Sequence, residues 1–284
     1  MPWSVIGFPK QKKYVEQLLK RDELPHALLF SGPEMIGKKL FAQDFYRLAN
    51  KREALQPMDA DFKLIAPNVQ EEETKIYIET IRDAKSFLSL TPSRGPYKFL
   101  IIDDADRMTP EASNALLKVL EEPPAHSVLI LVTSRPRVLP PTILSRCQVM
   151  RFLPQTDAEV SGAVASRRLP DAEQAFIVSS ANGRIGWALR MFEPDALVHA
   201  QRAIHDFQGI LKKNIAERFV FAKKLTEQKD YQNVVSFWLW WAHGALRRGN
   251  LAPRTVSELI RLQYILSQPQ YNHRLALEDF LLNV

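Results

Sequence analysis

A glycine-rich loop between an apolar strand and an amphipathic helix constrains the fold of this chain more than any other feature. Residues 32–39 read Gly-Pro-Glu-Met-Ile-Gly-Lys-Lys and match the phosphate-binding pattern G-x-x-x-x-G-K, except that Lys39 stands where Ser or Thr normally follows. Residues 26–31 predict a buried strand before the loop, and apolar residues at helical spacing predict a helix after it. This order of elements is the context that a phosphate-binding loop requires.

The loop keeps its phosphate-binding residues and lacks its magnesium ligand. In a working loop the backbone around Gly32 and Gly37 cradles phosphates, Lys38 contacts the outer phosphates, and a hydroxyl at the next position binds Mg²⁺. Lys39 cannot coordinate a cation. The alternative is a chance match on a surface turn, which the flanking strand and helix disfavour. We therefore expect the frame of an ATPase, with ATP and Mg²⁺ bound weakly or not at all.

Strand and helix signals alternate through about residue 155. Residues 98–102 and 127–133 are continuous apolar runs, which are typical of strands buried on both faces of a parallel sheet. Thr109 before Pro110 predicts the start of a helix between them, and Pro123-Pro124 predicts its end. The sequence thus predicts an α/β domain with a parallel sheet over residues 1–155.

Strand signals fade after Pro154, and the rest of the chain reads as helical. A break at residues 193–195 predicts a small helical domain over residues 156–194 and a C-terminal helical domain over residues 195–284. The aromatic run at residues 237–241 is interpreted as helix core, because a platform that stacks nucleic-acid bases also needs interleaved cations.

Composition excludes several classes of protein. The single cysteine, Cys147, excludes an intrachain disulfide and a multi-cysteine zinc site, so we expect no metal site and a buried thiol. No apolar run reaches the length of a membrane span, and the N-terminus lacks a signal-peptide pattern, so a cytoplasmic location is expected. The net charge of +6 suits a protein near nucleic acid without establishing contact.

Three further sites carry polar residues of interest. Asp103 ends an apolar strand, as in the Walker B element, where a carboxylate holds Mg²⁺; Asp104 follows, where a Glu usually orients the attacking water. Thr133-Ser134 fits either a polar sensor of phosphate or the start of a turn. Arg146 follows a short predicted helix and fits either an arginine finger that reaches a neighbour's phosphate or a surface ion pair.

Together these residues resemble the AAA+ clamp-loader subunits of bacterial DNA polymerase III, most closely the delta-prime type, over nearly the whole chain. The matching segments are Val5-Ile6-Gly7, residues 26–33, residues 114–124, Ser145-Arg146-Cys147 and residues 272–278. The resemblance implies a P-loop domain, a helical lid and a C-terminal collar domain. It also implies that Arg146 acts in trans, on the ATP of a neighbouring subunit.

Departures from the family pattern distinguish between its subunit types. In the ATPase subunits the position of Lys39 holds Thr or Ser, and that of Asp104 holds Glu. The position of Gly186 holds a sensor Arg in those subunits, and Met35 stands where their loop usually has a glycine. Arg184 and Arg190 are the two nearby arginines that could take the place of the sensor Arg. The four-cysteine zinc module usual in the family is also absent.

The resemblance therefore implies that the chain is a stator, a subunit that does not itself catalyse a reaction. It would belong to the DNA polymerase III holoenzyme, which is a DNA-directed DNA polymerase and thus a nucleotidyltransferase complex. Its implied partners are the gamma/tau ATPase subunits and the delta subunit, with the sliding clamp and primed DNA reached through the complex. Two alternatives remain. Lys38 and Asp103 favour an active gamma/tau-type ATPase, which Lys39 and Gly186 oppose. A non-replicative AAA+ scaffold is opposed by the 114–124 match.

Overall fold

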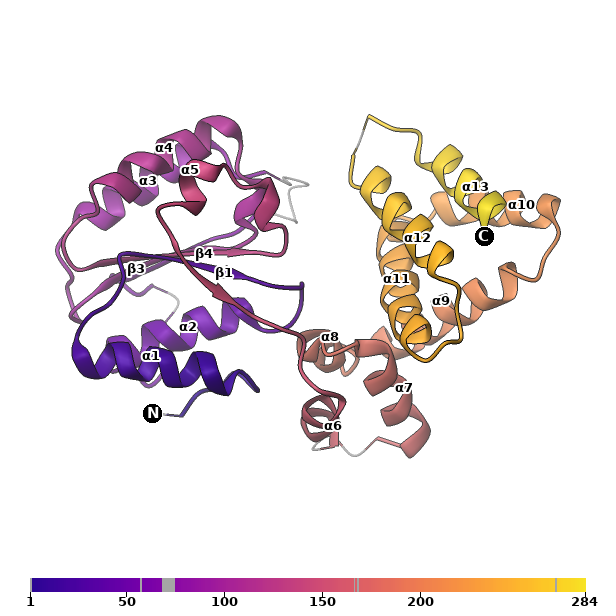
Figure 1. Cartoon of the computed structure of the whole chain (residues 1–284), viewed down its shortest axis with the longest axis horizontal. Coiled ribbons are helices and arrows are strands. Elements are labelled where there is room, and N and C mark those ends of the chain that lie inside the picture. Colours follow the sequence, from indigo (N-terminus) through magenta and orange to yellow (C-terminus); the bar gives the residue numbers. More distant parts are fainter. Residues whose placement is uncertain (1, 57, 68–74, 166, 168, 269) are drawn as a thin grey trace. The chain divides into compact units, whose positions relative to one another are not determined.

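The computed structural model describes residues 2–56, 58–67, 75–165, 167, 169–268 and 270–284. The chain divides into two compact units, Met1–Gln155 and Thr156–Val284. The first unit contains a sheet covered by helices, and the second is built of helices in its described part (Figure 1).

The first unit is organised by a five-stranded parallel sheet. The strands are β1 (Ala27–Ser31), β2 (Phe62–Ile65), β3 (Lys98–Ile102), β4 (Ser127–Thr133) and β5 (Gln148–Arg151). Their order is β2-β3-β4-β1-β5, and the central strands β1, β3 and β4 are buried along their whole length. The predicted strands at residues 98–102 and 127–133 are confirmed. Because parallel strands end at one edge, the loops after β1, β3 and β4 meet there.

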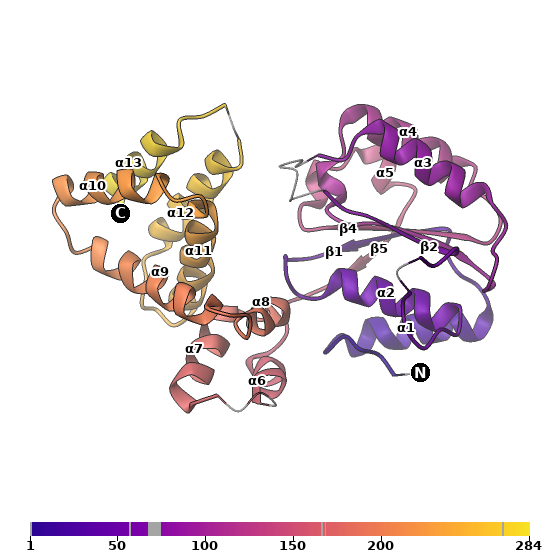
Figure 2. The same ribbon diagram turned by 180° about the vertical axis from the view of Figure 1, so that it is seen from behind.

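Helices cover both faces of this sheet (Figures 1 and 2). The helices of one face are α1 (Pro9–Arg21) and α2 (Lys38–Ala49); those of the other are α3 (Ile78–Ser89), α4 (Pro110–Glu121) and α5 (Pro141–Leu144). Two short 3₁₀ turns, η2 (Ala105–Arg107) and η3 (Pro136–Val138), follow β3 and β4. Strand residues alternate between the two cores, so that Phe30 packs with α2 and Leu29 packs with α3 and α4.

Helix α4 begins as its sequence predicts. The Thr109 side chain accepts a hydrogen bond from the Ala112 N–H at 3.2 Å, which caps the first turn, and Pro110 is the first helical residue. The helix ends at Glu121, two residues before Pro123. The predicted boundaries are confirmed.

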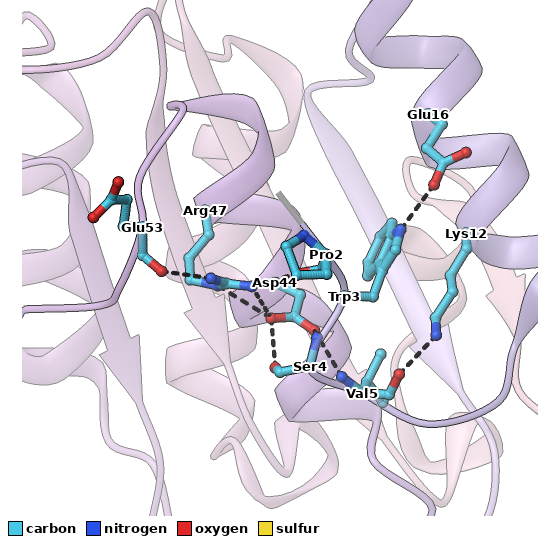
Figure 3. A network of polar contacts seen from close by, with 9 residues as sticks. All are labelled: Pro2, Trp3, Ser4, Val5, Lys12, Glu16, Asp44, Arg47 and Glu53. Atoms are coloured by element: carbon cyan, nitrogen blue, oxygen red, sulfur yellow. Dashed lines mark hydrogen bonds and ion pairs between the residues drawn. The ribbon is translucent and has the colours of Figure 1, made fainter.

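A buried carboxylate fixes the segment before α1 onto α2 (Figure 3). Asp44 is 1% exposed and accepts hydrogen bonds from the Ser4 and Val5 N–H groups at 2.7 and 2.9 Å and from the Ser4 hydroxyl at 2.7 Å. Arg47 pairs with the same carboxylate at 2.9 Å, and Lys12 donates to the Val5 carbonyl at 2.6 Å. Asp44 and Arg47, which anchor the N-terminal segment, thus belong to the helix that begins at the glycine-rich loop, and Lys12 of α1 adds a third contact.

The second unit consists of helices in its described residues. They are α6 (Asp157–Ala165), α7 (Asp171–Ala181), α8 (Ile185–Arg190), α9 (Ala196–Ile210), α10 (Ile215–Thr226), α11 (Tyr231–Arg247), α12 (Pro253–Leu266) and α13 (His273–Asn283). Asn182 and Gly183 adopt positive φ angles of 50° and 76° after α7, as a turn there requires. Helix α7 packs against both α6 and α11. A division of this unit at residues 194–195 stays a prediction.

The aromatic run of α11 belongs to the core, as predicted. Trp238 is fully buried, stacks on Phe207 with ring centroids 4.8 Å apart, and donates its indole N–H to the Ala203 carbonyl at 2.9 Å. The run therefore serves helix packing. Among the described residues, no helix is long and apolar enough to cross a membrane.

Candidate functional site

The glycine-rich loop connects β1 to α2 and takes the shape that its glycines allow. A Cβ atom on Gly32 would lie 2.2 Å from the Phe152 carbonyl oxygen, so only glycine fits there. Gly37 has a φ of 104° and precedes the first residue of α2. Met35 has a φ of 58°, a left-handed conformation that costs a non-glycine residue about 1 kcal/mol. The chain thus keeps a glycine conformation at Met35 while adding a large side chain.

Lys38 is bonded to the loop itself. It is 6% exposed, and its ammonium donates to the Gly32 carbonyl at 2.7 Å and to the Pro33 carbonyl at 2.6 Å. Burial lowers the pKa of Lys38, an effect opposed by the negative charges of Glu34 and Asp103. To contact a phosphate, the ammonium would have to leave these two carbonyls.

Lys39 forms an ion pair with the carboxylate at the end of β3. Its Nζ lies 3.0 Å from Oδ2 of Asp103, whose side chain is 18% exposed. An ammonium has three donors and no lone pair, so it cannot be a metal ligand. In a magnesium-dependent loop these two positions supply a hydroxyl and a carboxylate to the ion. The residues present therefore do not fit a Mg²⁺-nucleotide site.

The next two carboxylates along the chain also have cationic partners. Asp104 lies 3.6 Å from Arg107. The pKa of Asp104 is raised, chiefly by burial and secondly by the negative charge of Asp103. Asp106 is 8% exposed and lies 2.7 Å from Arg135, which follows β4. The sequence reasoning missed the pair of Asp106 with Arg135, because only the adjacency of β3 and β4 brings the two segments together.

Thr133, the last residue of β4, and Ser134 after it both form hydrogen bonds to other segments of the chain. Thr133 is fully buried, donates its hydroxyl to Asp106 at 2.5 Å and accepts the Arg135 N–H at 2.9 Å. Ser134 donates to the Glu34 carboxylate at 3.2 Å. The Arg135 N–H bond is local to a turn, whereas the other two bonds join this segment to the end of β3 and to the glycine-rich loop, so the choice between a turn and a phosphate sensor stays a prediction.

Arg146 follows α5 and is partly exposed. Its Nη2 lies 2.8 Å from Oε1 of Glu121, and its Nη1 donates to the Thr142 carbonyl at 3.1 Å. The side chains of Arg146 and Glu121 are 37% and 50% exposed, and exposed ion pairs contribute about 0–1 kcal/mol. A guanidinium held this weakly can exchange its partner for a phosphate at low cost.

Cys147 has the character of a structural residue, not of a reactive thiol. Cys147 is buried, as predicted, and burial raises the pKa of its thiol to about 12. No group of three or more His, Cys, Asp or Glu side chains in the described residues is arranged to hold a metal ion.

The two arginines considered as sensor substitutes lie in the second unit. The Arg184 guanidinium lies 5.9 Å from the centroid of the Trp240 ring, and Arg190 pairs with Glu193 at 3.5 Å. These contacts are with an aromatic ring and a carboxylate, and they do not test binding to phosphate. A sensor role for either residue stays a prediction.

We expect ATP with Mg²⁺ to bind the isolated chain weakly or undetectably. Lys38 is bonded to two loop carbonyls, and Lys39 takes the position of a metal ligand. Isothermal calorimetry with and without EDTA measures this directly. A micromolar affinity that depends on Mg²⁺ would contradict the expectation.

Comparison with known proteins places the chain among DNA polymerase III subunits. The family described as "DNA polymerase III, delta subunit" matches residues 7–156. The chain is 33% identical over 210 residues to the DNA polymerase III subunit tau of Bacillus subtilis (67% of this chain, 37% of tau). It is 34% identical over 179 residues to subunit delta' of Pseudomonas aeruginosa (58% and 54%) and 26% identical over 223 residues to subunit delta' of Bacillus subtilis (75% and 68%). The matches thus span less than two thirds of the first two relatives.

Solved structures agree on the fold. A DNA polymerase III gamma subunit-related protein of Thermotoga maritima aligns with a TM-score of 0.56 at 22% identity, covering 94% of this chain and 97% of that one. The RuvB Holliday junction branch migration motor of the same organism aligns with a TM-score of 0.50 at 19% identity, covering 73% and 67%. At these identities the likeness shows the shared fold and nothing finer.

Proposed function

This chain belongs to the DNA polymerase III delta-subunit family, and from that premise we propose that it is a delta-prime-type subunit of the clamp loader. In this role it does not hydrolyse ATP itself and serves as a stator while the complex places the sliding clamp on primed DNA. Relatives named delta' and relatives named tau or gamma both match the chain, so the choice between the two types depends on its own residues.

The ion pair of Lys39 with Asp103 carries the proposal. An ATPase subunit needs a hydroxyl and a free carboxylate for Mg²⁺, whereas here an ammonium lies 3.0 Å from that carboxylate. Met35, a large side chain in a left-handed conformation within the loop, points the same way. These contacts weigh against the gamma/tau-type alternative. The only support for that alternative at this site is that Lys38 and Asp103 are the residue types found in an active ATPase.

We further propose that Arg146 acts on the ATP of a neighbouring subunit. Arg146 would serve as an arginine finger for that neighbour: it lies on the connection between β4 and β5 and is held by an exposed ion pair with Glu121. A guanidinium stabilises the charge that develops on a transferring phosphoryl group, which is worth about 10³–10⁵ in rate where it acts. Glu121 would release Arg146 when a nucleotide phosphate arrives.

The remaining assignments follow from the same role. Residues 156–194 would form the lid, and residues 195–284 would join the collar that holds the ring together. The gamma/tau ATPase subunits and the delta subunit are the direct partners, while the clamp and DNA are contacted through the complex. The proposed location is the cytoplasm, where such a complex works.

We expect no appreciable ATP hydrolysis by the isolated chain. Lys39 replaces the hydroxyl that binds Mg²⁺, and Asp104, which pairs with Arg107, replaces the Glu that orients water. Steady-state hydrolysis is measured with primed DNA and the clamp present. A turnover of about 1 s⁻¹ or more would instead support an active gamma/tau-type subunit.

A further inference from the structure

The carboxylates that follow β3 are neutralised by the chain's own cations. Asp103 lies 3.0 Å from Lys39, Asp104 lies 3.6 Å from Arg107, and Asp106 lies 2.7 Å from Arg135. Two of these cations come from other elements: Lys39 from the start of α2, and Arg135 from the segment after β4. The edge of the sheet where a nucleotide-bound metal would lie is thus already charge-balanced.

We propose that Lys39 is a tethered counter-ion, which takes the place of a divalent cation beside Asp103 and closes the site to metal. The ammonium occupies the approach to Oδ2 of Asp103, and its positive charge repels a second cation. The P-loop fold is kept, while its metal requirement is replaced by a side chain. This inference rests on the proposed function and deepens it. It explains how the carboxylate of Asp103 is neutralised in a site that holds no metal.

The position of Lys39 makes it the residue that decides metal binding. Lys38 beside it points back to the Gly32 and Pro33 carbonyls, so it does not compensate Asp103 through a direct contact of its own. Lys39 is 46% exposed, so its removal opens Asp103 to solvent without creating a cavity. A neutral residue at position 39 would therefore leave Asp103 without a cationic partner, which a divalent ion can supply.

The test compares Mn²⁺ binding to the isolated chain by electron paramagnetic resonance, with and without ATP. The variants are Lys39→Thr, which adds a hydroxyl, and Lys39→Gln, which removes the charge without the hydroxyl. We expect wild type to show no Mn²⁺ site that depends on Asp103, and Lys39→Thr to bind Mn²⁺ at least about tenfold more tightly than wild type. We expect Lys39→Gln to bind Mn²⁺ with an intermediate affinity.

Two control variants isolate the ion pair. Lys39→Arg keeps the cation and should bind as little Mn²⁺ as wild type, and Asp103→Asn in the Lys39→Thr background should abolish the gained site. Mg²⁺ at about 10 mM should raise the Tm of Lys39→Thr by roughly 2–4 °C and leave that of wild type unchanged.

Two results would overturn the proposal. One is wild type binding Mn²⁺ through Asp103 as tightly as Lys39→Thr; the other is folded Lys39→Thr and Lys39→Gln both remaining indifferent to metal. Because all these measurements use the isolated chain, their failure is separate from failure of the stator role, which is tested in the assembled complex.

Discussion

Replacing Arg146 with alanine is expected to lower the DNA-stimulated ATPase of a reconstituted clamp loader by about tenfold or more, with the complex still assembled. The loss arises because the guanidinium stabilises charge in the transition state of a neighbouring subunit. The side chain is partly exposed and its pairing with Glu121 is weak, so the substitution should cost this chain little stability. Clamp loading should fall together with ATP hydrolysis.

The control variants separate a finger from a structural arginine. Arg146→Lys should rescue poorly, because an ammonium is a point charge without the guanidinium fork. Arg137→Ala removes an exposed arginine from η3, on the same connection between β4 and β5, and should leave the ATPase unchanged. If Arg146→Ala complexes hydrolyse ATP and load clamps as wild type does, Arg146 is only a surface residue.

Replacing Asp61 with alanine is expected to destabilise the first unit by about 3–5 kcal/mol. Asp61 is fully buried, accepts the N–H groups of Ser93, Arg94 and Gly95 at 2.7, 2.6 and 3.0 Å, and lies 3.5 Å from Lys98, which is 3% exposed. The substitution would leave a buried ammonium without its counter-ion and three donors without their acceptor.

Urea unfolding followed by circular dichroism measures this loss. Asp83→Ala on the exposed side of α3 is the matched control and should change the free energy of unfolding by less than about 0.5 kcal/mol. A loss below about 1 kcal/mol for Asp61→Ala would show that the buried pair does not support the turn before β3.

The contribution of Asp61 also depends on pH. Burial raises the pKa of Asp61, but the three N–H donors and the charge of Lys98 outweigh it and hold the pKa below its ordinary value. A depressed folded pKa means that the stabilisation is fully present above the unfolded value of about 3.9 and is lost as the pH falls through the folded value. The difference in unfolding free energy between wild type and Asp61→Asn should therefore shrink below about pH 4.

The strands and the cap of α4 were predictable because their signals are local. Residues 99–102 are all apolar because β3 is buried on both faces, and Thr109 caps a helix with a side chain three residues from its donor. The glycine-rich loop was equally predictable from the sequence. A side chain at Gly32 would clash with the Phe152 carbonyl oxygen, and it would also block the close approach of a phosphate to the backbone.

The ion pairs at the edge of the sheet could not be predicted in the same way. Lys39 precedes Asp103 by more than sixty residues, and their contact depends on where α2 and β3 lie in the folded sheet. The sequence indicated that Lys39 could not bind magnesium; it did not indicate that its ammonium would neutralise Asp103. For Arg146 the sequence left a surface ion pair open as one of two interpretations, and it did not indicate Glu121 as the partner.

Reconstitution of the clamp loader with and without this chain tests the central claim most directly. The gamma/tau-type and delta-type subunits of the same host are purified, mixed with this chain and analysed by size-exclusion chromatography and clamp loading on primed DNA. We expect the chain to enter a stable complex and clamp loading to require it. If the chain elutes alone and the other subunits load clamps equally well without it, the assignment is wrong.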